Sequence, residues 1–137
     1  CMAMATKDGW LKYDGRRPFI ITRAAYAGTQ RYSLVWTGDN QSIWAHLQMA
    51  IPQLCNLGLS GFSYAGTDVG GFGADTTKEL LARWVQVGCL SPFFRNHSAQ
   101  GTRRQEPWQF DKELLEIYRK YVELRYRLLV IYLRLLL

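Results

Sequence analysis

The stretch Tyr32-Ser-Leu-Val-Trp-Thr-Gly-Asp-Asn40 decides the fold that we expect for this chain. Its apolar first half predicts a short buried strand, which Gly38-Asp39-Asn40 ends abruptly. Spaced apolar residues then predict a helix over about 41–57, which Pro52 should kink or interrupt. Asp39 is therefore placed at a strand-to-helix corner. In parallel α/β proteins the carboxyl ends of the strands surround the ligand site, so this carboxylate is a candidate catalytic group.

A simpler alternative is that Asp39 or Asn40 only caps the helix that follows. The recurrence of the corner favours chemistry, because Asp39, Asp68 and His97 are 29 residues apart, twice over, and each follows a short apolar or aromatic run. A (β/α)8 barrel uses roughly 31 residues per strand–helix unit. Arg23 fits as the mouth residue of a preceding strand. The sequence predicts an α/β fold: about four units of a (β/α)8 TIM barrel, its second half, in one domain over residues 1–137.

The remaining segments follow the same pattern. Thr76 and Glu79 form a capping box for a helix over about 76–88. Residues 1–16 are polar, with turn signals at Asp8-Gly9 and Asp14-Gly15. A long polar loop over 95–108 is of the kind that carries function. The other elements that we expect are strands near 18–23, 32–37, 61–66 and 89–94 and a helix over about 111–129.

Composition excludes several classes of protein. The net charge is +6 and the sequence pI about 9.4, but the arginines are scattered and no nucleic-acid motif accompanies them, so we expect no nucleic-acid partner. The apolar end, residues 128–137, contains an arginine and is too short to cross a bilayer, so we expect no membrane association. The first residue is Cys1, which suggests a piece of a longer polypeptide.

Cysteine and histidine positions argue against a cofactor. Cys55 and Cys89 lie in apolar surroundings, which predicts reduced core residues and a cytoplasmic location. His46 and His97 do not form a recognisable ligand set, so we expect no metal, and His46 is interpreted as a structural or surface residue. The glycines of 66–73 match neither nucleotide-binding pattern, so we expect no cofactor.

Four segments of the sequence carry a further signal: Arg17-Pro-Phe-Ile-Ile-Thr-Arg23, Trp36-Thr-Gly-Asp-Asn40, Gly66-Thr-Asp-Val-Gly-Gly-Phe72 and Ser91-Pro-Phe-Phe-Arg-Asn-His97. In this order and spacing they resemble successive signatures of family 31 of the glycoside hydrolases, the family of α-glucosidases and α-xylosidases. The resemblance covers about residues 14 to 129 and continues through Gln105-Glu-Pro-Trp108 and Leu124-Arg-Tyr-Arg-Leu128.

The resemblance implies a barrel enzyme that cleaves terminal α-linked sugars with retention, acting on an α-glucoside or a related oligosaccharide. Asp39 matches the family's general acid/base. Six positions match those that line the subsite for the sugar at the cleaved end: Arg23, Trp36, Asp68, Phe72, Arg95 and His97. For Trp36 and Phe72 the alternative is plain barrel core, and for Arg95 it is a structural ion pair.

Two features depart from the family. Its nucleophile is an aspartate in a Trp-x-Asp-Met-Asn-like motif on an earlier strand, and this sequence contains no such segment. The family usually continues Arg-Leu-Leu-Pro-Tyr-Leu-Tyr after the last helix, where this sequence has Val130-Ile-Tyr-Leu-Arg-Leu-Leu-Leu137. We therefore expect the chain alone to be inactive, and either to form a homo-oligomer or to pair with the missing N-terminal half of the barrel. The alternative function is an inactive half barrel that self-associates and at most binds sugar.

Overall fold

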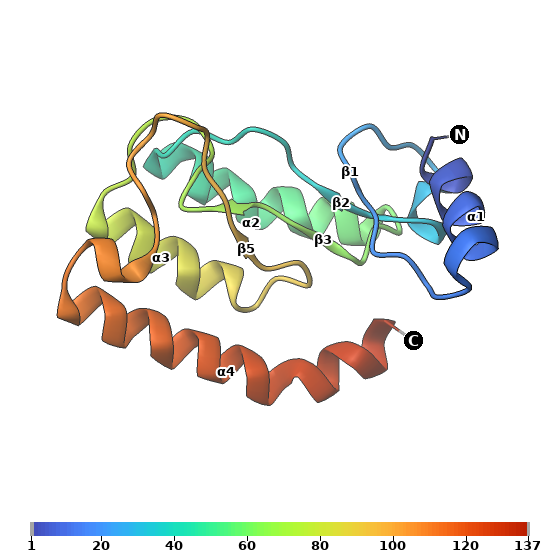
Figure 1. Ribbon diagram of the computed structural model, residues 1–137. Helices are drawn as coiled ribbons and strands as arrows, with labels where there is room; N and C mark the ends of the chain where they lie inside the picture. Colours follow the sequence, from blue (N-terminus) through green and yellow to red (C-terminus); the bar gives the residue numbers. More distant parts are fainter. Residues whose placement is uncertain (1, 137) are drawn as a thin grey trace.

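A computed structural model describes residues 2–136, and the side chains of all of these except residues 133, 135 and 136 (Figure 1). Five short strands alternate with helices along most of the chain. The helices are α1 (Met2–Asp14), α2 (Trp44–Leu59), α3 (Lys78–Gly88) and α4 (Lys112–Leu136), with short 3₁₀ turns η1 (Thr29–Arg31) and η2 (Pro107–Gln109). The strands are β1 (Ile21–Thr22), β2 (Leu34–Trp36), β3 (Ala65–Gly66), β4 (Asp68–Val69) and β5 (Arg95–Asn96).

All strand pairs in the described residues are parallel. The order β1-β2-β3 forms one sheet, with Thr22 opposite Val35 and Trp36 opposite Gly66, and β4-β5 forms a second pair, with Asp68 opposite Arg95. Strand neighbours are therefore neighbours in the sequence, as the spacing of the corners predicts. The chain has the parallel α/β architecture expected for barrel-type folds.

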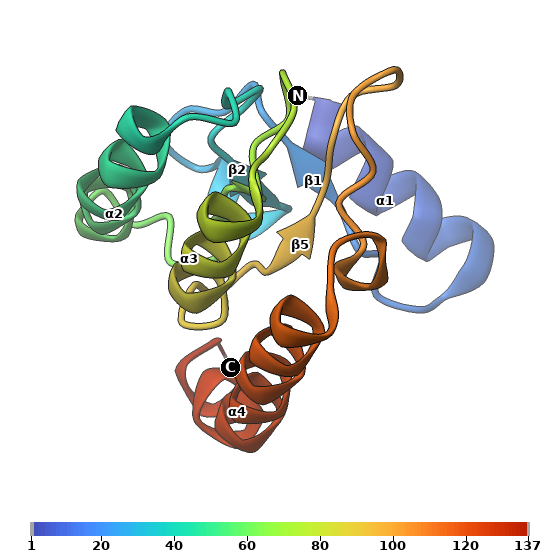
Figure 2. The same ribbon diagram turned by 90° about the vertical axis from the view of Figure 1, so that its left-hand side faces the viewer.

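The core lies between β4 and the helices that cover it. Trp84, on α3, is fully buried and donates from its indole Nε1 to Thr67 Oγ1 at 2.9 Å. Around it pack other fully or nearly fully buried side chains from β4, α2, α3 and α4: Leu47, Val69, Leu80, Leu81, Val85 and Leu114. Helix α4 runs alongside α3 (Figure 2), where Arg125 donates to the backbone carbonyls of Cys89, Ser91 and Pro92. This packing fixes the strand ends that carry the candidate site.

The N-terminal segment differs from the prediction. Residues predicted as polar with turns form α1, because Ala, Met, Leu and Lys favour a helix strongly enough to outweigh Asp8-Gly9. The second turn signal is correct, since the helix ends at Asp14 and the Gly15 N–H donates to the Leu11 carbonyl at 3.0 Å. None of the side chains of α1 is buried.

Two details of helices α2 and α3 differ from the prediction. Pro52 lies inside α2, which continues through it, because Gln48 and Pro52 are exposed and water can bond the carbonyl that Pro52 leaves free. The predicted capping box at Thr76 is wrong by one residue. The N-cap of α3 is Thr77, whose Oγ1 accepts from the Leu80 N–H, while Thr76 is fully buried.

The last strand and one cysteine also need correction. The strand predicted near 89–94 lies instead at Arg95–Asn96, because Cys89 to Pro92 form the turn that follows α3. Cys89 is buried, as predicted, but Cys55 is exposed on α2, since it faces away from the core. Helix α4 begins near the predicted residue and extends past 129 to Leu136. Within residues 2–136, no helix combines the length and apolarity that crossing a membrane requires.

Candidate active site

Asp39 lies directly after β2, at the corner that leads into α2. The preceding Gly38 has a φ of +87°, and a Cβ at this position would lie 3.0 Å from Arg23 Cδ, so the turn favours glycine. Arg23 Nη1 lies 3.3 Å from Asp39 Oδ1, and both side chains are about half exposed. The N-cap of α2 is Ile43, so neither Asp39 nor Asn40 caps that helix. The Asp39 carboxylate is therefore open to a ligand.

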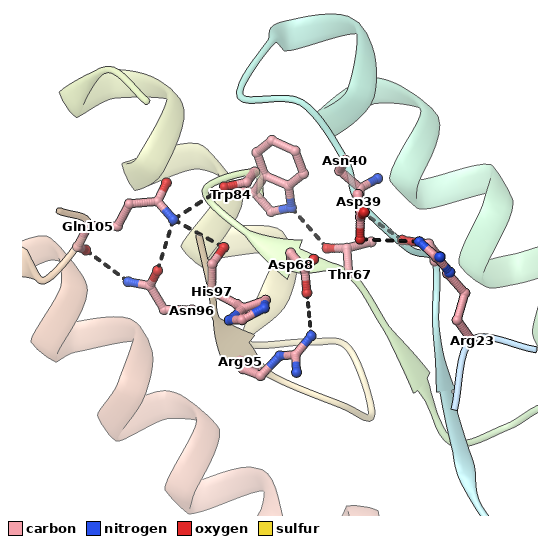
Figure 3. Close-up of polar contacts among 12 residues, drawn as sticks. Arg23, Asp39, Asn40, Thr67, Asp68, Trp84, Arg95, Asn96, His97 and Gln105 are labelled. Atoms are coloured by element: carbon pink, nitrogen blue, oxygen red, sulfur yellow. Dashed lines mark hydrogen bonds and ion pairs between the residues drawn. The ribbon is translucent and has the colours of Figure 1, made fainter. Parts of the chain in front are cut away.

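Asp68 is the first residue of β4 and its side chain is fully buried. Arg95, its register partner on β5, donates from Nη2 to Asp68 Oδ1 at 2.5 Å (Figure 3). The Arg95 guanidinium also lies over the rings of Trp36, at 5.6 Å, and Phe93, at 5.3 Å. The ion pair considered for Arg95 is thus present. Among the described residues Asp68 Oδ2 has no hydrogen-bond partner, although this oxygen is buried.

The electrostatic surroundings of Asp68 connect it with the other candidate residues. Burial raises the pKa of its carboxyl above the ordinary value, and the hydrogen bond and positive charge of Arg95 oppose that rise. His97 lowers this pKa and Asp39 raises it, through their charges. The charges of Asp39 and His97 therefore both act on the Asp68 carboxyl.

A raised pKa makes stability depend on pH in a definite direction. In the native protein Asp68 keeps its proton above the ordinary value of 3.8, whereas the unfolded chain releases it. The native state then binds more protons, so the contribution of Asp68 to the free energy of unfolding falls as pH rises from 3.8 through the raised pKa. In urea titrations at several pH values, we expect Asp68→Asn to lack this fall. Identical pH profiles for the two proteins would contradict the expectation.

The rings of Phe72 and His97 lie together and form one wall of the site. Their rings lie 5.2 Å apart at an interplanar angle of 32°, with Phe72 half-buried and His97 exposed. Trp36, at the end of β2, is also half-buried, and its indole Nε1 has no partner in the described chain. Neither Trp36 nor Phe72 belongs to the buried core, so both offer apolar surface at the strand ends.

Asn40 and Gln105, which were not among the predicted site residues, connect the segments that carry the site. The Asn40 carbonyl accepts from the N–H groups of Phe72, at 2.7 Å, and Gly73, at 2.9 Å, while its side chain accepts from Thr37 Oγ1. The buried Gln105 links the segments around Phe72 and His97 (Figure 3). The only sequence signal for these two residues was that they lie in the segments that resemble the family. Their side-chain amides do not by themselves indicate a role in a site.

The site is open rather than enclosed. A hollow of about 720 Å³ lies beside it, lined by His97 and by residues of the 98–108 loop, but not by Asp39 or Asp68. His46, which we interpreted as a structural or surface residue, accepts from the Gln41 N–H through Nδ1 at 2.7 Å and so has a structural contact. Over the residues that the structure describes, no three His, Cys, Asp or Glu side chains gather as a potential metal site.

These features define a parallel α/β domain with carboxylates and basic side chains at its strand ends. The chain matches the model of the "Glycosyl hydrolases family 31 TIM-barrel domain" over residues 1–134. It is 55% identical over 127 residues to Alpha-glucosidase 2 of Bacillus thermoamyloliquefaciens. It superposes with a TM-score of 0.94 and 41% identity on the Family 31 alpha-glucosidase from Bacteroides thetaiotaomicron, and with 0.88 and 41% on the alpha3-Glc2-bound glucosidase II alpha subunit. The chain belongs to family 31 of the glycosyl hydrolases, and the resemblance of its segments is confirmed.

The matched region is a small part of each relative. It covers 92% of this chain but 16% of Alpha-glucosidase 2. For the two structures it covers 98% and 91% of this chain, and 23% and 14% of the relative. The relatives' activities therefore belong to polypeptides several times longer than the segment compared.

Proposed function

We propose that this chain supplies the acid/base half of a retaining α-glucosidase active site, acting on terminal α-linked sugars. The observation that carries the proposal is the presence of two carboxylates in different environments, one after β2 and one after its neighbour β3. Asp39 is half exposed and accessible, while Asp68 is buried, held by Arg95, and keeps one oxygen without a partner. One solved relative is described as binding alpha3-Glc2, which fits a sugar ligand of this class.

Asp39 has the geometry for proton transfer. Protonated, it would donate its proton to the oxygen of the leaving group as the glycosidic bond breaks. As a carboxylate, it would then take a proton from the water that completes hydrolysis. Arg23, at 3.3 Å, would stabilise the carboxylate form between these steps. Exposure to solvent allows water to reach the same atom.

The remaining candidates would hold the sugar. The exposed His97 imidazole would bond a hydroxyl of the ring, and Asp68 Oδ2 would accept from a second hydroxyl once the side chains that bury it move aside. Trp36 and Phe72 would contact the apolar faces of the sugar, and Arg95 would hold the Asp68 carboxylate in position.

Retention requires a second carboxyl group, about 5–5.5 Å from the first, that attacks the anomeric carbon. Asp68 is poorly suited to that attack, because it is fully buried and bound to Arg95 through one oxygen. We therefore propose that the nucleophile comes from a different segment of polypeptide. The isolated chain would then bind sugar without turning it over.

The test is to measure, on the folded chain, both binding of methyl α-glucoside and hydrolysis of an aryl α-glucoside. We expect saturable binding that Asp68→Ala weakens at least tenfold, and no hydrolysis above the level of an Asp39→Ala control. Absence of binding by a folded chain would contradict the proposed sugar site. Hydrolysis that disappears in Asp39→Ala would show that the chain finds a second carboxylate, from Asp68 or from another copy.

The alternative function is a non-catalytic half barrel that associates with itself. Exposed aromatic side chains on either side of β1, Phe19 before it and Tyr26 after it, support this alternative, because apolar surface of this kind favours association. A two-fold dimer would combine two sets of parallel strands. Sedimentation should then give twice the 15.8 kDa of one chain, and a single-chain mass would contradict self-association.

A further inference from the structure

Gln105 lies in the loop between β5 and η2, and its side chain is almost completely buried, at 4% exposure. Its amide Nε2 lies within donor distance of three oxygens: the Gly71 carbonyl at 3.3 Å, the His97 carbonyl at 3.2 Å and Asn96 Oδ1 at 3.3 Å. In return, Asn96 Nδ2 donates to the Gln105 carbonyl at 2.8 Å. In Figure 3 dashed lines run from this amide to His97 and to Asn96.

The two carbonyls are adjacent to the walls of the proposed sugar site. Gly71 directly precedes Phe72, and His97 is itself a candidate ligand of the sugar. A backbone hydrogen bond from the Ala99 N–H to the Phe72 carbonyl, at 2.8 Å, joins the same two loops further out. Gln105 is thus a buried side chain that joins the Phe72 loop to the His97 loop, and the exposed Arg103 adds a link to the Thr76 carbonyl.

An amide suits this position, and a carboxylate does not. All three partners of Nε2 are oxygens that accept hydrogen bonds, so a donor is required. The other amide atom, Oε1, is buried without a partner, and a Cβ at Gly70 would come within 2.5 Å of it. The site is therefore closely fitted around glutamine. A glutamate of the same shape would place negative oxygen against three acceptors.

We propose that Gln105 is a positioning residue for the sugar subsite, which acts by holding the Phe72 and His97 rings in a fixed relation. The role in sugar binding rests on the proposed function. The positioning itself concerns only the Phe72 and His97 rings, whose centroids lie 5.2 Å apart. Without the amide donor, the two loops lose their buried link. The His97 imidazole and the Phe72 ring then sample several relative positions, and a sugar bound between them is held less tightly.

The experiment compares the chain with Gln105→Glu and Gln105→Met, using Gln109→Glu as the matched control, because Gln109 is exposed on η2. Two readouts are taken on samples with native circular dichroism. The first is the nuclear Overhauser effect between the Phe72 and His97 ring protons, together with their ring-current shifts. The second is the dissociation constant for methyl α-glucoside.

We expect the ring contact to disappear in both Gln105 variants and to persist in the control, with binding weakened about tenfold only in the Gln105 variants. Gln105→Met keeps the proposal testable if buried charge prevents Gln105→Glu from folding. An unchanged ring contact in either folded variant overturns the proposal. If the parent chain binds no sugar, the proposed function fails, and the ring contact alone then decides whether Gln105 positions the two loops.

Discussion

Arg95→Met is expected to lower the free energy of unfolding at neutral pH by roughly 3–5 kcal/mol, because removing one partner of a buried ion pair leaves the other charge uncompensated. Asp68 is fully buried, and among the described residues Arg95 Nη2 is the only donor to its carboxylate, at 2.5 Å. A domain of this size has a stability of about 5–15 kcal/mol, so the loss is a large share of the whole. Methionine keeps an unbranched apolar side chain against the Trp36 and Phe93 rings.

A double-mutant cycle separates the ion pair from packing. Arg95→Met leaves the buried Asp68 carboxylate without a partner, and Asp68→Asn removes that charge. The double variant should therefore be more stable than Arg95→Met alone. The loss in Arg95→Met should also shrink at acid pH, where Asp68 takes up a proton. Urea unfolding of the four proteins at two pH values measures both effects. Additive single losses with no dependence on pH would show that the ion pair does not hold β4 and β5 together.

The strand-end residues could be predicted because they are local in sequence and regularly spaced. Asp39, Asp68 and His97 follow apolar runs at equal intervals, and parallel strands place such positions on one edge. Their separate environments could not be predicted in this way. Burial of Asp68 and exposure of Asp39 depend on which neighbouring strand covers each side chain, and the register pair Asp68–Arg95 joins residues 27 positions apart.

Errors in the fold prediction have the same physical origin. Helix α1 was missed, and an interruption was considered at Pro52 where α2 continues, because single turn or breaker residues were given more weight than the surrounding propensity. The last strand lies at Arg95–Asn96 because the turn after α3 is held by Arg125 of α4, a contact between distant segments. Gln105 was missed for a related reason, since its donors and acceptors lie on two loops that meet only in the folded chain.

An external nucleophile should reveal the proposed acid function of Asp39 in a chain that has no nucleophile of its own. Formate is a small carboxylate that can attack the anomeric carbon of a bound α-glucoside from the face opposite the leaving group. Asp39 would give its proton to the departing oxygen, and the glucosyl formate would then hydrolyse to glucose. We expect sodium formate, but not sodium chloride at the same ionic strength, to produce glucose release from the folded chain.

The dependence on the leaving group identifies the proton donor. General acid catalysis contributes roughly 10²–10⁴-fold to rate, and most to leaving groups that depart poorly without a proton. Asp39→Asn should therefore reduce formate-dependent release from an alkyl α-glucoside by about this factor, and from a nitrophenyl α-glucoside far less. Asp8→Asn, an exposed change on α1, serves as the control and should match the parent chain. Equal losses on both substrates would indicate that Asp39 binds the sugar, because a proton donor must discriminate between leaving groups and a binding residue need not.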